Sequence, residues 1–91
     1  MTIHNVMEEL VKDCLKEYLV RKPEVETLLD DGMKSDIMAI VLNRLPPKYV
    51  STEKGEMFSK TQLRVKHESD VFRELSLAVN KVLDTDRAKD F

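Results

Sequence analysis

The sequence predicts an all-α fold, a compact helical domain with a short extended segment near residues 49–58. Apolar residues recur at helical intervals along residues 6–20 and again along residues 60–84. Residues with the spacing of a helix capping box, in which two side chains satisfy free N–H groups at a helix start, stand just before both stretches. A hydrophobic share of 42% and a charged share of 35% are typical of a soluble helical domain.

The first helix is expected over residues 6–20, after a capping box formed by Asn5 and Glu8. Its opposite face is charged, and such a face is normally solvated. The apolar stripe consists of Met7, Leu10, Val11, Cys14, Leu15, Tyr18 and Leu19. This stripe is expected to face the core.

A short second helix is expected over residues 23–31, with Pro23 in its first turn, where a missing N–H costs nothing. Gly32 is expected to end this helix in the left-handed conformation that glycine adopts easily. The helix would bury Val25, Leu28 and Leu29.

A third helix is expected over residues 36–44, with Ser35 as its N-cap. Residues 37–42 are all apolar, so this helix should be buried on several sides. It must end near Arg44, because a proline disfavours the helical conformation of the residue before it, and prolines occupy positions 46 and 47.

The segment after the double proline is expected to be extended up to about residue 58. A hairpin with Gly55 at a positive-φ loop position and an unpaired extended arm are both open. The last helix is expected over residues 60–84, after a capping box of Ser59 and Gln62. Its polar first half, residues 64–70, would project from the core or lie along another subunit, and the tail after it would be frayed.

Composition limits the possible partners and location of the protein. With 15 basic and 17 acidic residues the net charge is -2, so no global basic surface indicates direct DNA binding. The longest apolar run is too short to span a bilayer, and the acidic start lacks the basic region of a signal peptide. We therefore expect a cytoplasmic protein without a membrane span.

No enzyme is expected. Cys14 with His4 or His67 is the only thiol–imidazole combination, and Cys14 lies in an apolar stripe where a buried thiol is unreactive. His67 stands between Lys66 and Glu68, where a solvated side chain is expected. The sequence contains no HExxH, glycine-rich phosphate loop or Gly-x-Ser-x-Gly motif.

A homodimer is expected from size and patterning. A chain of this length buries only about 60–65% of its unfolded surface, which leaves limited stability. The apolar stripes exceed what one small core needs, so their faces would form both core and subunit interface.

Two segments resemble the late competence development protein ComFB family: NVMEEL at residues 5–10 and DIMAIVLNRLPPKYV at residues 36–50. The resemblance covers most of the chain and implies one ComFB-like domain over residues 1–91. It implies a small, helical, dimeric regulatory or binding protein with a role in competence.

Many members of this family carry a closely spaced cysteine cluster just before the position of Asp36. In this chain the matching positions are Leu28, Asp30 and Met33. Because zinc in such a site needs thiolates or imidazoles, no zinc site is carried over, and we expect neither a metal nor a cofactor. Hydrophobic packing of the short second helix would replace the metal.

The resemblance also implies a ligand, because some ComFB-like proteins are receptors for cyclic di-GMP. Such a ligand presents two phosphates and two guanines, so a receptor needs cationic side chains and flat surfaces. Arg44 and Lys48 would bind phosphate, Tyr49 would stack on a base, and Asp36 and Asn43, seven residues apart on one helix face, would contact guanine edges.

Each of these five residues also has a structural explanation as a helix-terminal charge, a cap or a packed ring. The alternative function is therefore a ligand-free dimeric adaptor associated with competence and DNA uptake, which binds a competence or regulatory protein.

Overall fold

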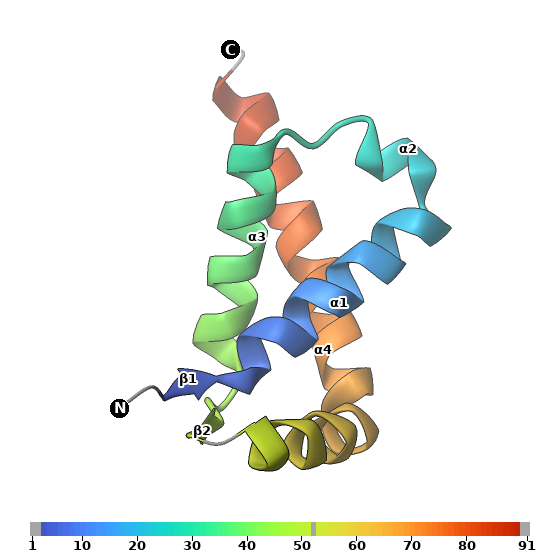
Figure 1. Cartoon of the computed structure of the whole chain (residues 1–91). Helices are drawn as coiled ribbons and strands as arrows, with labels where there is room; N and C mark the ends of the chain where they lie inside the picture. Colours follow the sequence, from blue (N-terminus) through green and yellow to red (C-terminus); the bar gives the residue numbers. More distant parts are fainter. Residues whose placement is uncertain (1–2, 52, 90–91) are drawn as a thin grey trace.

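The computed structural model describes residues 3–51 and 53–89, and these confirm the all-α prediction (Figure 1). The described residues form the following elements: β1 (His4–Asn5), α1 (Val6–Arg21), α2 (Pro23–Glu26), α3 (Asp31–Arg44), β2 (Tyr49–Val50) and α4 (Glu53–Lys89).

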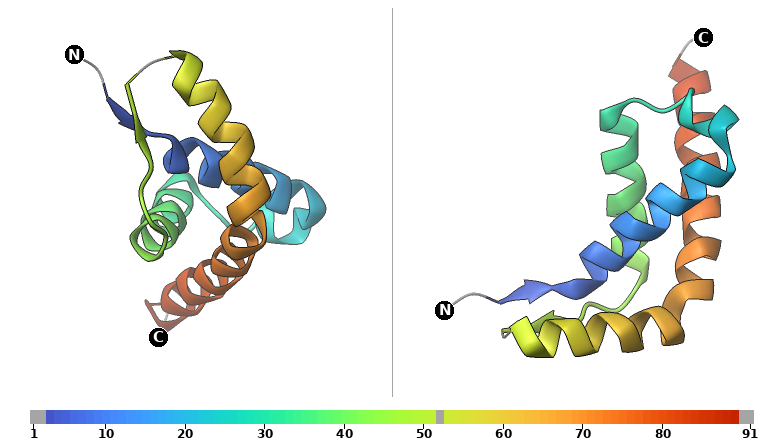
Figure 2. Two further views of the ribbon diagram at one scale, coloured as in Figure 1. Left: turned by 90° about the horizontal axis from the view of Figure 1, so that it is seen from below. Right: turned by 45° about the vertical axis from the view of Figure 1, so that its right-hand side comes forward.

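The three long helices α1, α3 and α4 contact one another pairwise. Helix α4 turns sharply, so that its N-terminal limb passes beneath the start of α1 and its C-terminal limb runs beside α3 (Figure 2). The core lies where the three helices meet. Its fully buried side chains include Val6, Val11, Cys14, Ile37, Val41, Val71 and Leu75.

Asn5 joins the start of α1 to the segment after the double proline. Its Oδ1 accepts hydrogen bonds from the Met7 N–H at 3.1 Å and from the Lys48 N–H at 2.8 Å. Strands β1 and β2 pair antiparallel beside this contact, and the Val6 N–H donates to the Lys48 carbonyl at 2.7 Å. The predicted first helix is confirmed to within one residue at its end.

The predictions for the second helix were partly wrong. Helix α2 has only four residues, and Leu28 is 54% exposed, although Leu29 is buried. Gly32 has no positive φ and lies inside the first turn of α3. The reason is that Asp30 caps α3, since its Oδ1 accepts the Met33 N–H at 2.8 Å.

Helix α3 therefore begins five residues before the predicted start at Asp36, and the prediction that Ser35 is its N-cap was wrong. Its predicted end at Arg44 is confirmed, because Leu45 has extended backbone angles of φ -111° and ψ 147°.

The prediction that α3 is buried on several sides is also wrong for the single chain. Only Ile37 and Val41 of this helix are fully buried, because α1 and α4 cover one side of it. Met38, Ile40 and Leu42 are half-buried.

The predicted extended segment is limited to the residues around β2. Its partner is β1 and not residues 56–58, so the hairpin is wrong, while residue 52 lies outside the described residues. Gly55 and the predicted cap Ser59 lie within α4, and this helix continues to Lys89 instead of ending near residue 84. Glutamate, lysine and methionine around Gly55 favour a helix, and they outweigh a cost of about 1 kcal/mol for one glycine.

Candidate functional site

The structure places the five predicted ligand residues in different surroundings. Asp36 and Arg44 line a groove between α3 and α4. Lys48 lines a separate hollow beside the double proline. Asn43 is exposed on α3, and the Tyr49 side chain is 62% exposed on β2. The five side chains therefore do not converge on one cavity within a single chain.

The groove between α3 and α4 consists of two adjoining cavities, of about 330 Å³ and about 160 Å³, which share Ile40 and Lys81 in their linings. Asp36 lies in the first cavity, while Arg44 lies in the second together with Glu74. The groove contains the carboxylates of Asp36 and Glu74 together with the cations Arg44 and Lys81, so its field is of mixed sign.

Arg44 lies close to the carboxylate of Glu74, which has little access to water. Its Nε lies 3.8 Å from Glu74 Oε2, too far for a hydrogen bond, and the Glu74 side chain is only 14% exposed. This Glu74 oxygen is buried and accepts no hydrogen bond. The attraction to Glu74 gives Arg44 a structural role that competes with binding an external phosphate.

The hollow beside the double proline has a volume of about 430 Å³. Its lining consists of Met7, Pro46, Pro47, Lys48, Gln62, Leu63, Lys66 and His67. We refer to it below as the proline hollow. It is built from the start of α1, the segment between α3 and β2, and the N-terminal limb of α4.

Positive charge predominates in the proline hollow. Lys48 and Lys66 are exposed, His67 is half-buried, and the lining residues whose side chains the structure describes include no carboxylate. Among the residues that the structure describes, the side chains of these three residues form no ion pair or hydrogen bond. The hollow therefore offers two uncommitted ammonium groups and an imidazole beside the apolar rings of two prolines.

Sequence reasoning missed Lys66 and His67. Residues 64–70 are mostly polar, which favours a solvated face, and the sequence does not show which segment packs against this helix. The available signal was the spacing of Gln62, Leu63, Lys66 and His67, which share one helix face, with a buried leucine in the middle.

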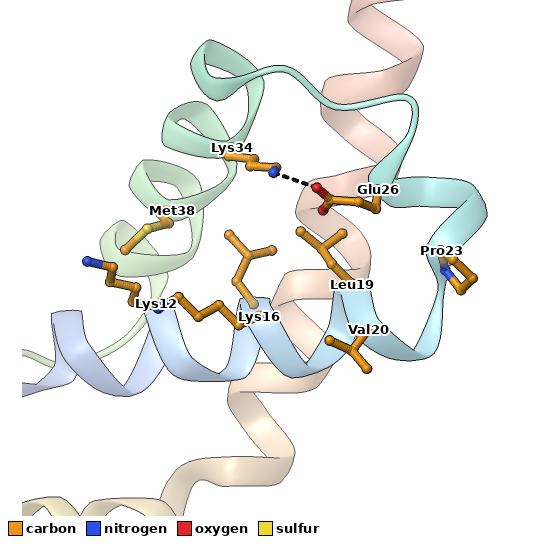
Figure 3. A pocket seen from close by; sticks show the side chains of 9 residues that line it. Lys12, Lys16, Leu19, Val20, Pro23, Glu26, Lys34 and Met38 are labelled. Atoms are coloured by element: carbon orange, nitrogen blue, oxygen red, sulfur yellow. Dashed lines mark hydrogen bonds and ion pairs between the residues drawn. The ribbon is translucent and has the colours of Figure 1, made fainter.

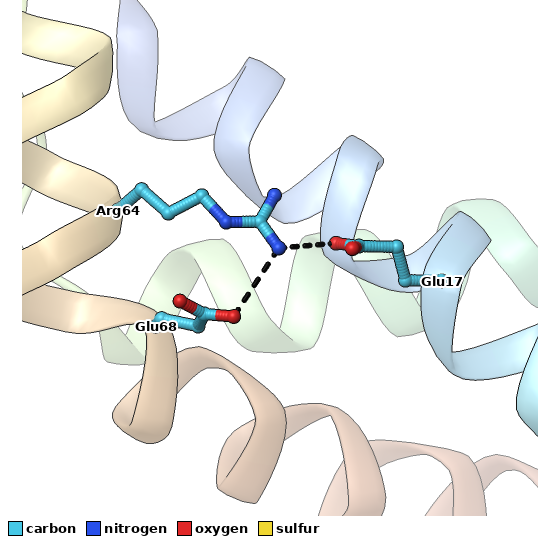
Figure 4. A network of polar contacts seen from close by, with 3 residues as sticks. All are labelled: Glu17, Arg64 and Glu68. Carbon is cyan, nitrogen blue, oxygen red and sulfur yellow. Dashed lines mark hydrogen bonds and ion pairs between the residues drawn. The ribbon is translucent and has the colours of Figure 1, made fainter.

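Arg64 positions the limb of α4 that carries these residues. Its Nη2 donates to Glu17 Oε2 of α1 at 2.6 Å and to Glu68 Oε1 at 3.2 Å (Figure 4). These hydrogen bonds, to Glu17 first and then to Glu68, raise the pKa of the guanidinium above its ordinary value. The contact ties the α4 limb to α1.

Cys14 has the environment of a structural thiol. Its side chain is fully buried, and desolvation, opposed in part by Arg64, raises the pKa of the thiol to about 11. Since the thiolate is the reactive species, this cysteine is a poor nucleophile at neutral pH.

Within residues 3–51 and 53–89, no three or more His, Cys, Asp or Glu side chains are grouped so that they could hold a metal ion. In the same ranges, no helix combines the length and apolarity required to cross a lipid bilayer.

Comparison with known proteins gives a family match. The family described as late competence development protein ComFB matches residues 4–86. The solved structure of the late competence protein ComFB from Bacillus subtilis has 22% sequence identity and a TM-score of 0.75, and the alignment covers 91% of this chain and 90% of that chain. At this identity the structural comparison shows the shared fold. No curated protein sequence matches the chain.

Proposed function

The chain belongs to the late competence development protein ComFB family, and from this premise we propose that it is a non-enzymatic regulatory protein that binds cyclic di-GMP in the proline hollow. The observation that carries the proposal is the pair of uncommitted ammonium groups of Lys48 and Lys66 in this cavity, beside the imidazole of His67, with no carboxylate among the lining residues whose side chains the structure describes. We further propose that it acts in the cytoplasm as a homodimer.

The phosphate groups provide the first reason for this site. Cyclic di-GMP is a dianion, and the protein as a whole has a net charge of -2, so binding needs a local excess of positive charge. Lys48 and Lys66 provide two ammonium groups from different segments of the chain. Arg44 is the weaker candidate, because Glu74 already lies 3.8 Å from it.

The bases provide the second reason. The rings of Pro46 and Pro47 offer apolar surface for a base, and the amide of Gln62 can both donate to and accept from the edge of guanine. The exposed ring of Tyr49 follows directly after Lys48 and is available to stack on a base.

The size of the proline hollow supports a dimeric receptor. A volume of about 430 Å³ lies at the small end of the range for ligand pockets, roughly 300–1,000 Å³, so it suits one nucleotide half of the ligand. Cyclic di-GMP has two identical halves, and a two-fold symmetric dimer would present the same hollow to each of them.

The test is isothermal titration of the protein with cyclic di-GMP at near-physiological salt, with cyclic di-AMP and linear pGpG as controls. We expect saturable binding selective for cyclic di-GMP, and at least tenfold weaker binding for Lys48→Ala and for Lys66→Ala. Lys81→Ala is the matched control, because it removes an exposed lysine of α4 that lines the other groove.

Absence of heat at two temperatures, together with absence of a ligand-induced rise in Tm, would refute the proposal. Equal weakening by Lys81→Ala would also refute the assignment to the proline hollow. It would instead place the ligand between α3 and α4.

A second candidate function is a ligand-free dimeric adaptor in competence and DNA uptake. It is favoured by the apolar side chains that the single chain leaves uncovered along α3 and α4, among them half-buried Ile40 and Leu77, which is 56% exposed. Light scattering distinguishes the two. A dimer that dissociates in Leu77→Glu, combined with no response to cyclic di-GMP, would support the adaptor.

A further inference from the structure

A cavity of about 650 Å³ lies on a different face, between α1 and α3, and is flanked by α2 (Figure 3). We refer to it as the α1–α3 groove. None of its lining residues that the structure describes belongs to the proline hollow or to the groove between α3 and α4. It therefore constitutes a surface separate from both.

The floor of the α1–α3 groove is apolar. Leu15 and Leu19 of α1 and Met38 of α3 line it, with Val20 and Pro23 at the end nearest α2. The Val20 side chain is 80% exposed, so the apolar surface continues from the floor to the rim. An exposed valine continuous with a hollowed apolar floor is typical of a binding surface.

The rim is basic. Among the described lining residues, Lys12, Lys16 and Lys34 are accompanied by a single carboxylate, that of Glu26. Lys34 is occupied, because its Nζ donates to Glu26 Oε1 at 2.9 Å and this ion pair spans from α3 to α2 (Figure 3). Lys12 and Lys16 are exposed and form no ion pair with any residue that the structure describes.

We propose that the α1–α3 groove binds an acidic amphipathic helix of a partner protein. Lys12 and Lys16 lie one turn apart on one face of α1, about 6 Å along its axis, which matches carboxylates four residues apart on a helix. From Lys12 to Val20 the groove runs about 12 Å along α1, the length of two helical turns. The apolar face of the partner helix lies on Leu15, Leu19 and Met38.

Charge complementarity selects this occupant. The chain as a whole has a net charge of -2, yet the rim of this groove carries two free ammonium groups, so an acidic segment is attracted here. The apolar floor supplies the contact area of a helix-in-groove complex.

The test uses fluorescence anisotropy with labelled 16-residue peptides that are acetylated and amidated at their ends. Each peptide carries leucines at helical spacing, which form an apolar stripe, and pairs of glutamates four residues apart. The glutamate pairs lie on one side of this stripe in the first version and on the other side in the second version. Control peptides carry lysine in place of each glutamate. We expect saturable binding of at least one acidic peptide, with affinity that falls as salt rises, and no binding of the controls.

The protein variant Lys12→Glu/Lys16→Glu is expected to bind the acidic peptide at least tenfold more weakly. Arg73→Glu/Lys81→Glu, which makes the same change of charge on exposed positions of α4, is the control and should bind as the unaltered protein does. Lys48→Ala should bind the acidic peptide as the unaltered protein does, with or without added cyclic di-GMP. A failure of this proposal can therefore be distinguished from a failure of the cyclic di-GMP proposal.

Several results would overturn the proposal. These are absence of saturable binding for both acidic peptides, equal loss in the two charge-reversed variants, or binding of the lysine peptides. If Val20→Glu converts a dimer into a monomer in light scattering, the groove is instead the interface with a second copy. Binding to anionic vesicles that is lost in Lys12→Glu/Lys16→Glu would assign it to a membrane surface.

Discussion

Arg44→Ala is expected to destabilise the protein through Glu74 and not only through lost packing of Arg44. The Arg44 Nε lies 3.8 Å from Glu74 Oε2, and this oxygen is buried without a hydrogen bond. Removal of the guanidinium leaves a carboxylate with neither a counterion nor full access to water. The loss of stability therefore comes mainly from the unpaired carboxylate of Glu74.

The magnitude follows from the distance and the exposure. Two unit charges at about this separation attract by roughly 4 kcal/mol at an effective dielectric constant of about 20. The Arg44 side chain is 59% exposed, so solvent screens much of that attraction, whereas the Glu74 side chain is only 14% exposed. The pair lies between exposed pairs, worth about 0.2–1 kcal/mol, and buried pairs, whose disruption costs about 3–5 kcal/mol. We expect a loss of about 1–2 kcal/mol.

The assay is a double-mutant cycle that consists of Arg44→Ala, Glu74→Gln and the double variant. Unfolding in urea is monitored by circular dichroism. A loss of about 1–2 kcal/mol corresponds to a fall in Tm of roughly 4–16 °C for a domain of this size. In the Glu74→Gln background, where no charge is left behind, Arg44→Ala should cost less than about 0.5 kcal/mol. An equal cost in both backgrounds would refute the reasoning.

Three further predictions concern the core, the thiol and the start of α3. Leu75 is fully buried where α4 meets the other helices, so Leu75→Ala should lower the free energy of unfolding by about 2–5 kcal/mol. A loss below about 1 kcal/mol in urea unfolding would contradict the place of Leu75 in the core. Cys14 has a pKa raised from 9.0 to about 11, so its contribution to stability is complete below about pH 9 and is lost as the pH rises towards 11. The unaltered protein should therefore lose more unfolding free energy than Cys14→Ala over this range, and parallel pH curves would contradict the burial of the thiol. Asp30→Ala should cost about 0.5–2 kcal/mol through the lost cap, whereas Ser35→Ala should change stability by less, and the reverse order would place the start of α3 at the later residue.

The parts of the fold that could be predicted are those with a strong local cause. The Asn5 cap and the apolar stripe after it define α1, and the double proline ends α3 at Arg44. The start of α3 could not be decided in this way, because Asp30 and Ser35 are both good capping residues. Only the contact made by the Asp30 carboxylate distinguishes them.

The parts that could not be predicted depend on contacts between distant segments. The strand partner of Tyr49 is Asn5, 44 positions earlier, and no local pattern announces that pairing. Similarly, Lys66 and His67 become site candidates because contacts such as that between Arg64 and Glu17 tie the N-terminal limb of α4 to α1. Residues 64–70 alone resemble a solvated helix face.

These two long-range contacts also determine how the proline hollow is held. On one side, Asn5 Oδ1 accepts the N–H groups of both Met7 and Lys48, so the cap of α1 and the position of Lys48 depend on the same atom. On the other side, Lys66 belongs to a limb tied to α1 by Arg64, whose side chain is 37% exposed and whose ion pairs are therefore weak. One wall is thus held by hydrogen bonds from backbone N–H groups to the Asn5 side chain, and the other includes a solvated contact. An anion that bridges Lys48 and Lys66 would add its binding free energy to the weaker attachment. The effect of ligand binding at this site would then be transmitted through movement of the α4 limb.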